Sequence, residues 1–146
     1  MFPLDIEEIV KGYKAAVFDF DGTLWNIELD WDKLYHRFSE IGQLYGHVGR
    51  FKSILDAYQW SEKVYRARDH LIEVQDEFEE MGFPGKGVPE GSAAARWRIA
   101  KGMKCAVVSL NTSSTIENAV GSWGFYPIIS IDKVRKPKPD PEGLLM

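Results

Sequence analysis

The sequence contains one cysteine, Cys105, among 146 residues, and only a small excess of acidic over basic side chains. A single cysteine excludes an internal disulfide framework and a cysteine-rich zinc site. The 18 Lys and Arg residues against 22 Asp and Glu residues give a net charge of −4. A protein that binds the phosphate backbone of nucleic acids needs clustered cations, so we expect no nucleic-acid partner.

Long apolar runs are also absent. The mostly apolar stretch around residues 15–20 is far too short to cross a bilayer. The first residues, Met1 to Asp5, lack the basic start and the apolar run of a secretory signal. We therefore expect a cytoplasmic protein with no membrane partner. Hydrophobic residues make up 45% of the chain, which is too apolar for disorder, and the length allows one core with a small insertion.

Short apolar runs alternate with helical periods along the chain. Three runs are predicted to be buried strands: residues 15–20, 105–108 and 128–131. Three segments are predicted to be helices outside the insertion: residues 4–12, 90–101 and 113–123. Parallel strands joined through helices predict an α/β fold, a Rossmann-like three-layer parallel sheet.

The segment from about residue 28 to 82 is predicted to be helical throughout, because apolar residues recur in it at helical spacing. One such stripe contains Trp31, Tyr35 and Phe38, which we expect to form the core of a helical bundle rather than to contact a substrate. The predicted organisation is a discontinuous core of residues 1–24 and 83–146, with an all-helical domain of residues 25–82 inserted after the first strand.

Polar side chains follow each predicted strand. Asp19 and Asp21 come after the first strand, Ser109 after the second, and Lys136 after the third and a short loop. In an open parallel sheet, ligands bind beyond the carboxyl ends of the strands. The convergence of these side chains therefore predicts a binding or catalytic site at this end of the sheet.

Each of these features has a purely structural alternative. Asp19 and Asp21 leave an extended segment on the same side and suit a hard ion such as Mg²⁺, but they can also be part of an Asp-Gly turn with Gly22. The hydroxyl of Ser109 can donate to a phosphoryl oxygen or belong to a helix N-cap. Lys136 starts a proline-fixed segment that can bind an anion or act as a solvated linker.

Taken together, the segments resemble the haloacid dehalogenase-like hydrolases, most closely their phosphoglycolate-phosphatase-like branch with a helical cap. Residues 17–24 (VFDFDGTL) resemble the first motif of that family, residues 107–111 (VVSLN) the second, and residues 136–141 (KPKPDP) the third. The resemblance covers residues 14–146. It implies a Rossmann-like core in which the inserted helices form a cap over the active site.

The resemblance also implies a role for each matching residue. Asp19 would be the nucleophile and a Mg²⁺ ligand. Asp21 would protonate the leaving oxygen, activate water and bind Mg²⁺ through its backbone carbonyl. Lys136 would balance the charge around Asp19. The candidate phosphate-binding residues are Phe20, Gly22, Thr23, Ser109, Leu110 and Asn111.

The function implied by the resemblance is a Mg²⁺-dependent phosphomonoester hydrolase that acts on a small phosphorylated metabolite through an aspartyl-phosphate. One alternative is a sugar phosphomutase of the same family. Another is a catalytically inactive fragment that binds a phosphate ligand or a partner protein. Family dehalogenases lack the second aspartate, so Asp21 argues against that activity.

One departure concerns the fourth motif of the family, an acidic pair that completes the Mg²⁺ site after a further helix and strand. Ten residues follow Lys136, and Glu142 among them stands too early to serve. We expect a truncated copy or a natural remnant, with residues 15–20 at an unpaired sheet edge that favours self-association. The metal site would be weakened, and the 146-residue chain inactive at ordinary Mg²⁺.

Overall fold

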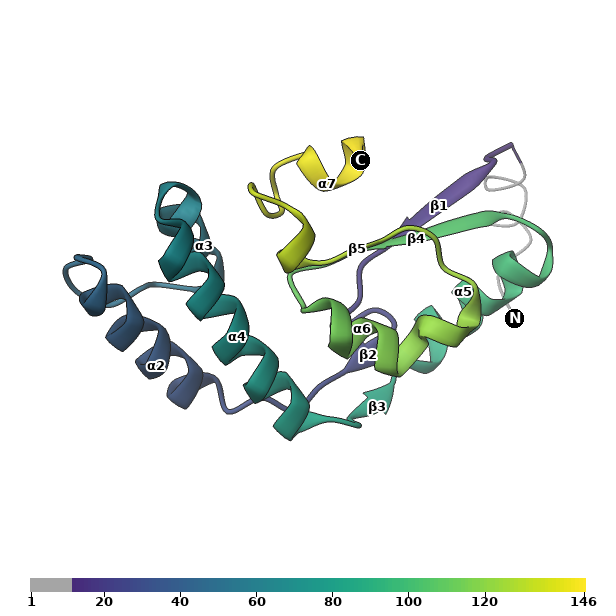
Figure 1. Ribbon diagram of the computed structural model, residues 1–146. Helices are drawn as coiled ribbons and strands as arrows, with labels where there is room; N and C mark the ends of the chain where they lie inside the picture. Colours follow the sequence, from purple (N-terminus) through teal and green to yellow (C-terminus); the bar gives the residue numbers. More distant parts are fainter. Residues whose placement is uncertain (1–11) are drawn as a thin grey trace.

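The computed structural model describes residues 12–146, so the helix expected at residues 4–12 lies outside the described residues except for Gly12. A parallel sheet and its covering helices form one part of the molecule, and three helices form another (Figure 1). No helix within residues 12–146 combines the length and apolarity needed to span a membrane.

The central sheet has three parallel strands in the order β1, β4, β5. β1 comprises Ala15–Phe18, β4 Lys104–Val108 and β5 Ile128–Ile129. The register pairs Val17 with Ala106 and Val107 with Ile128. Helices separate these parallel strands along the chain, and the strands lie side by side in the sheet. This arrangement confirms the predicted α/β, Rossmann-like fold.

Helices lie on both faces of this sheet (Figure 1). α5 (Pro89–Ala100) and α6 (Ser113–Val120) pack on one face, where Ala95 and Ile116 share a core with Val107. A short 3₁₀ turn, η2 (Gly121–Trp123), extends α6. α7 (Glu142–Leu145) lies on the other face, where Gly143 approaches the side chains of Val108 and Ile129. A second 3₁₀ turn, η3 (Ile131–Lys133), follows β5.

β1 is half-buried, so the expectation of a strand buried on both faces is wrong for one face. Phe18 packs against the core on the side of α5 and α6, whereas 54% of the Val17 surface is exposed. β1 has only β4 as a neighbour among the described strands, so its other edge is open. The edge position expected for residues 15–20 is therefore present in the described part of the chain.

The inserted segment forms a helical cap of three helices and one 3₁₀ turn. The helices are α2 (Trp31–Leu44), α3 (Ile54–Trp60) and α4 (Tyr65–Gly82), and η1 (Ser61–Lys63) joins α3 to α4. Asp30 caps α2 through the Lys33 N–H, and Ser53 caps α3 through the Asp56 N–H. Apolar side chains from all three helices, among them Phe38 and Tyr58, form a second core, which Ile131 of η3 joins.

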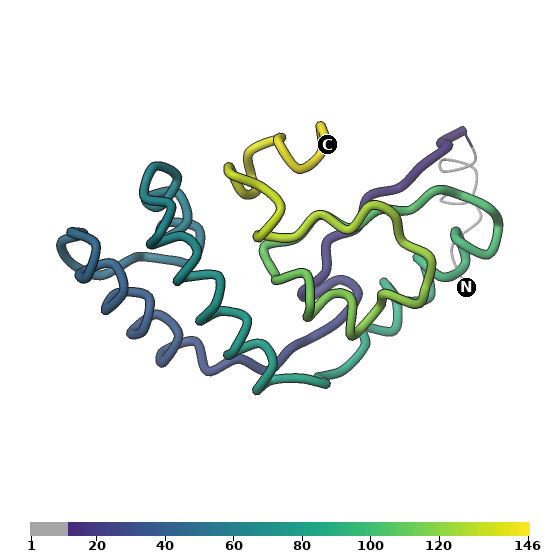
Figure 2. Tube along the Cα trace, viewed as in Figure 1, coloured from purple at the N-terminus to yellow at the C-terminus, as the bar shows by residue number. Residues whose placement is uncertain are grey.

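A short antiparallel ribbon joins the cap to the sheet domain. Figure 2 shows that the chain enters the cap and returns from it along two neighbouring paths. β2 (Trp25–Asn26) pairs there with β3 (Lys86–Gly87). Gly85 has φ +62°, and a Cβ at that position would collide with the carbonyl oxygen of Asn26. The segments that enter and leave the cap therefore need a glycine at position 85, where they lie close together.

Candidate active site

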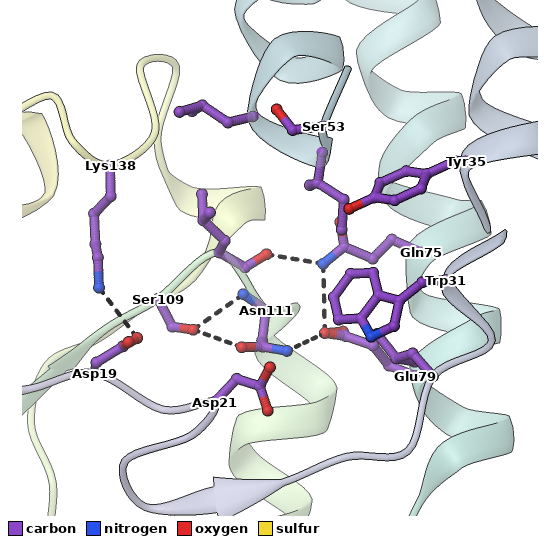
Figure 3. A pocket seen from close by; sticks show the side chains of 14 residues that line it. Asp19, Asp21, Trp31, Tyr35, Ser53, Gln75, Glu79, Ser109, Asn111 and Lys138 are labelled. Atoms are coloured by element: carbon purple, nitrogen blue, oxygen red, sulfur yellow. Dashed lines mark hydrogen bonds and ion pairs between the residues drawn. The ribbon is translucent and has the colours of Figure 1, made fainter. Parts of the chain in front are cut away.

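Asp19 lies just beyond the carboxyl end of β1, where the sheet faces the cap. Its Oδ1 accepts a hydrogen bond from the Phe20 backbone N–H at 2.8 Å. The same oxygen lies 3.1 Å from Nζ of Lys138 (Figure 3). A half-exposed carboxylate paired with one ammonium group has the position and charge balance of a nucleophile for an anionic substrate.

Asp21 follows in a tight turn that the sequence Asp-Gly forms readily. Gly22 takes φ +77° and its N–H donates to the Trp25 carbonyl at 2.9 Å. Burial raises the pKa of the Asp21 carboxyl, and the negative charge of Asp19 raises it further. The facing backbone N–H groups of Ile27 and Gly22 oppose this shift without cancelling it. A carboxyl that holds its proton more tightly suits a general acid.

The lysine beside Asp19 is Lys138, and not Lys136 as the third motif predicted. Nζ of Lys138 also donates to the Val108 carbonyl at 2.9 Å, so the ammonium group is held between β1 and β4. Lys136 is exposed, and its backbone N–H donates to Glu142 Oε2. Both lysines precede a proline, so the local sequence gave no means of telling them apart.

The loop after β4 brings Ser109 and Asn111 beside the two aspartates. The Ser109 hydroxyl donates to Asn111 Oδ1 at 2.7 Å, and the Asn111 N–H donates to Ser109 Oγ at 3.1 Å. The N-cap of α6 is Thr112, whose side chain makes no capping hydrogen bond. Neither Ser109 nor Asn111 is therefore needed as a helix cap, and both line the cavity beside Asp19.

Glu79 of α4 connects the cap to this loop. The carboxylate is fully buried and accepts hydrogen bonds from the Asn111 side-chain amide and, at 3.1 Å, from the Thr112 backbone N–H. The hydroxyls of Thr112 and Thr115 lie 3.0 and 3.2 Å from its Oε2. Burial raises the pKa of Glu79, and these donors reduce the shift. The hydrogen bonds couple the position of α4 to the Ser109–Asn111 loop.

Gln75 lies one turn before Glu79 and makes a second connection. Its Nε2 donates to the Leu110 carbonyl at 2.8 Å, and its Oε1 accepts from the Tyr58 hydroxyl at 2.6 Å. Both polar ends of this buried side chain are therefore partnered. The cap thus contacts the sheet domain through these polar side chains and through Ile131 of η3, which is fully buried in the apolar cluster of the cap helices.

A cavity of about 340 Å³ separates Asp19 from the cap helices (Figure 3). The sheet domain contributes five lining residues: Asp19, Ser109, Leu110, Asn111 and Lys138. Asp21 and Leu29 come from the segment that leads to the cap. The cap contributes Trp31, Tyr35, Ser53, Ile54, Leu55, Gln75 and Glu79. This volume is enough for a small organic phosphate.

Some of the predicted phosphate-binding residues line this cavity and others do not. Ser109, Leu110 and Asn111 line it as candidate phosphate-binding residues should, whereas Phe20, Gly22 and Thr23 do not. The side chain of Phe20 is fully buried in the core of the sheet domain, because alternate residues after β1 point to opposite faces. Trp31 and Tyr35 line the cavity, and Tyr35 also packs against the bundle core, whereas Phe38 is the residue of this aromatic stripe that is fully buried.

The donor atoms fit only part of a Mg²⁺ site. The carboxylate of Asp19 and the backbone carbonyl of Asp21 are hard oxygen donors of the kind that Mg²⁺ prefers. Within residues 12–146, however, no group of three or more Asp, Glu, His or Cys side chains is placed to hold a metal ion. From the described residues, a bound Mg²⁺ would take these oxygens and complete its shell with water or substrate.

Three residues of the site were not predicted from the sequence: Gln75, Glu79 and Lys138. Gln75 and Glu79 follow Leu71 at intervals of four, so the three lie on one face of α4. Helical spacing also places the apolar residues Leu71, Val74, Phe78 and Met81 on one stripe of this helix, and that stripe hid the polar face, although Met81 is 72% exposed and Glu79 is buried. Polar residues that continue an apolar stripe at helical spacing were the available signal.

No protein-family model and no curated protein matches this sequence. Solved structures do share its fold. A haloacid dehalogenase-like hydrolase from Bacteroides fragilis has a TM-score of 0.57 and 20% identity, over 91% of this chain and 70% of that chain. A β-phosphoglucomutase from Thermotoga maritima has a TM-score of 0.50 and 19% identity, over 91% of this chain and 68% of that chain.

A third similar structure is CbbY from Rhodobacter sphaeroides in complex with xylulose-1,5-bisphosphate. It has a TM-score of 0.50 and 15% identity, over 90% of this chain and 69% of that chain. The chain therefore has the haloacid dehalogenase-like fold that its motifs predicted. At identities of 15–20% the similarity identifies the fold, and the chemistry has to come from the site itself.

Proposed function

We propose that this protein is a phosphomonoester hydrolase that acts on a small phosphorylated metabolite, with Asp19 as its nucleophile. The observation that carries the proposal is the pairing of Asp19 with Lys138 at 3.1 Å, at the mouth of a cavity that Asp21 also lines. A carboxylate attacking an anionic phosphate needs a cation beside it, and Lys138 supplies one.

The reaction would proceed in two displacements. An Oδ atom of Asp19 attacks phosphorus, the ester P–O bond breaks, and the leaving oxygen takes the proton of Asp21. Water then attacks the phosphorus of the aspartyl-phosphate while Asp21 takes a proton from it, and phosphate leaves with Asp19 regenerated. The raised pKa of Asp21 supports the first role, because a larger fraction of the carboxyl keeps its proton near neutral pH.

Phosphate binding is proposed for the loop that follows β4. Ser109 would exchange its hydrogen bond to Asn111 for one to a phosphoryl oxygen, while the side-chain amide N–H of Asn111 keeps its hydrogen bond to Glu79. Lys138 would remain beside the attacked phosphorus and stabilise the charge on the equatorial oxygens. Asp19, Ser109 and Lys138 follow three different strands of the sheet, and ligands of parallel sheets bind at such strand ends.

Mg²⁺ remains part of the proposal, with the Asp19 carboxylate and the Asp21 carbonyl as its protein ligands. When bound, the ion would neutralise charge on the substrate. A chelator is expected to stop turnover and added Mg²⁺ to restore it, whereas full activity in EDTA would remove the metal from the proposal.

A second candidate is a protein that binds phosphate without turning it over. The observation in its favour is that the described residues bring together no third acidic metal ligand. The two candidates differ in a single assay, hydrolysis of p-nitrophenyl phosphate. The hydrolase requires measurable turnover that the nearly isosteric Asp19→Asn change lowers on the order of 10⁴-fold. Binding of inorganic phosphate without any turnover in the unchanged protein would favour the second candidate.

A further inference from the structure

We propose that the cavity selects phosphate esters whose leaving group carries no second anion and presents an apolar or aromatic surface. This inference rests on the proposed function and specifies its substrate class. It concerns the part of the cavity that lies between Asp19 and the cap helices, which the leaving group would occupy.

The charges that line the cavity are the first argument. Among the described residues that line the cavity, Lys138 is the one cation, and Asp19 already pairs with it at 3.1 Å. Lys33 and Lys52, which stand close in sequence to the lining residues Trp31, Tyr35 and Ser53, are exposed and do not line the cavity. A carboxylate or second phosphate on the leaving group would therefore meet no cation from the cap.

The acidic side chains on the cap side are the second argument. Asp21 and Glu79 both line the cavity, and Glu79 accepts its hydrogen bonds from uncharged groups alone, those of Gln75, Asn111, Thr112 and Thr115. An anion entering this end loses water and meets acidic groups rather than a cation, so the cost of its desolvation is not offset.

The remaining wall is suited to an uncharged group. Leu29, Ile54 and Leu55 contribute aliphatic surface, and Trp31 and Tyr35 present aromatic rings 6.0 Å apart between centroids (Figure 3). Both polar ends of Gln75 are partnered within the protein, and the Ser53 hydroxyl that caps α3 carries no charge. A ring or short chain without charge fits these surfaces.

The same reasoning weighs against the phosphomutase alternative for this chain. A sugar phosphomutase passes through a bisphosphate, so its site must hold two phosphate groups at once. CbbY was solved with a bisphosphate, and that protein has the same fold. In the present chain a second phosphate would lie on the cap side of the cavity. None of the described cap residues that line the cavity is a cation.

A matched pair of substrates tests the inference. 4-Carbamoylphenyl phosphate and 4-carboxyphenyl phosphate have the same shape and differ in one negative charge. We expect kcat/KM for the carbamoyl compound to be higher by at least about tenfold, since a misplaced like charge costs more than the 1.4 kcal/mol that a factor of ten represents. Equal values for the two compounds would overturn the inference and leave the proposed hydrolase standing.

Binding to the Asp19→Asn variant separates the inference from turnover. Calorimetry with the same two compounds should give tighter binding of the carbamoyl compound by a similar factor, whether or not the unchanged protein hydrolyses either. A preference in binding without hydrolysis would sustain the selectivity and defeat the hydrolase. Binding of neither compound, or of both equally, would defeat the selectivity.

A gain-of-charge variant provides the complementary test. Leu55 lines the cavity from α3 and is half-buried, so Leu55→Lys places a cation on the cap side. This change should narrow or reverse the preference, while Leu55→Met, which keeps the volume without the charge, should leave it intact. An unchanged preference in a folded Leu55→Lys protein would contradict the electrostatic account.

Discussion

Nζ of Lys138 lies 3.1 Å from Oδ1 of Asp19, although the two residues belong to opposite ends of the chain. The pair forms because the loop after β5 crosses the carboxyl end of the sheet, where the Val108 carbonyl also accepts from Lys138 at 2.9 Å. Side chains of both residues are exposed by a third or more, so the pair adds at most about 1 kcal/mol to stability. Its importance is expected in catalysis.

Replacing Lys138 by alanine should lower kcat/KM for p-nitrophenyl phosphate about 100-fold, which is about 3 kcal/mol of transition-state stabilisation. The reason is that no other lining residue can neutralise charge beside Asp19. Lys136→Ala is the matched control, because Lys136 is exposed in the same proline-rich segment. It should change kcat/KM less than about threefold. A large loss in Lys136→Ala with little effect of Lys138→Ala would return the role to Lys136.

Glu79 should make folding stability depend on pH. Burial raises its pKa in the folded state, so the folded protein binds this proton more tightly than the unfolded chain does. The stability that protonation contributes is complete below the ordinary pKa of glutamate and is lost as the pH rises through the raised value. Glu79→Gln removes this titrating group. As the pH rises through the raised pKa, the free energy of unfolding of the variant should therefore fall less than that of the unchanged protein.

Urea denaturation at a series of pH values measures this difference. Glu80→Gln is the control, because Glu80 is the next residue on α4 and is exposed. It should track the unchanged protein at every pH. Parallel pH profiles for Glu79→Gln and the unchanged protein would show that the buried carboxyl does not titrate between the folded and unfolded states as argued.

The open edge of β1 should favour association between copies of the chain. Val17 is 54% exposed on a strand that pairs on one side only among the described strands, and such an edge can add a further strand. Val17→Lys should lower the average mass measured by light scattering at high protein concentration. Val48→Lys alters a valine that is 92% exposed in the cap, and it should have no such effect. An unchanged protein that is monomeric at all concentrations would refute the association.

Much of this fold could be predicted from the sequence because its signals are local. The apolar runs before Asp19 and Ser109 are strands, and both polar groups lie at the predicted end of the sheet. The half-exposed face of β1 could not be predicted in this way. Burial depends on which element covers a strand, and α7 packs near Val108 and Ile129 rather than over Val17.

The site residues Lys138 and Glu79 could not be predicted for a similar reason, because contacts between distant segments decide their positions. Whether Lys136 or Lys138 reaches Asp19 depends on the path of a loop across the sheet, and both lysines precede a proline. Glu79 is buried only because the Asn111–Thr115 segment, distant in sequence, offers it hydrogen-bond donors. Such pairings between distant segments carry no periodic signal.

The central claim is that Asp19 carries the phosphoryl group, and the most direct test is to trap it there. In Asp21→Asn, p-nitrophenyl phosphate should still phosphorylate Asp19, since p-nitrophenolate leaves without a proton, while hydrolysis of the intermediate is slowed. Mass spectrometry after acid quench should find one hydroxylamine-labile phosphoryl group on the peptide that contains Asp19. No phosphopeptide during turnover, or a phosphoryl group on another residue such as Ser109, would contradict the account.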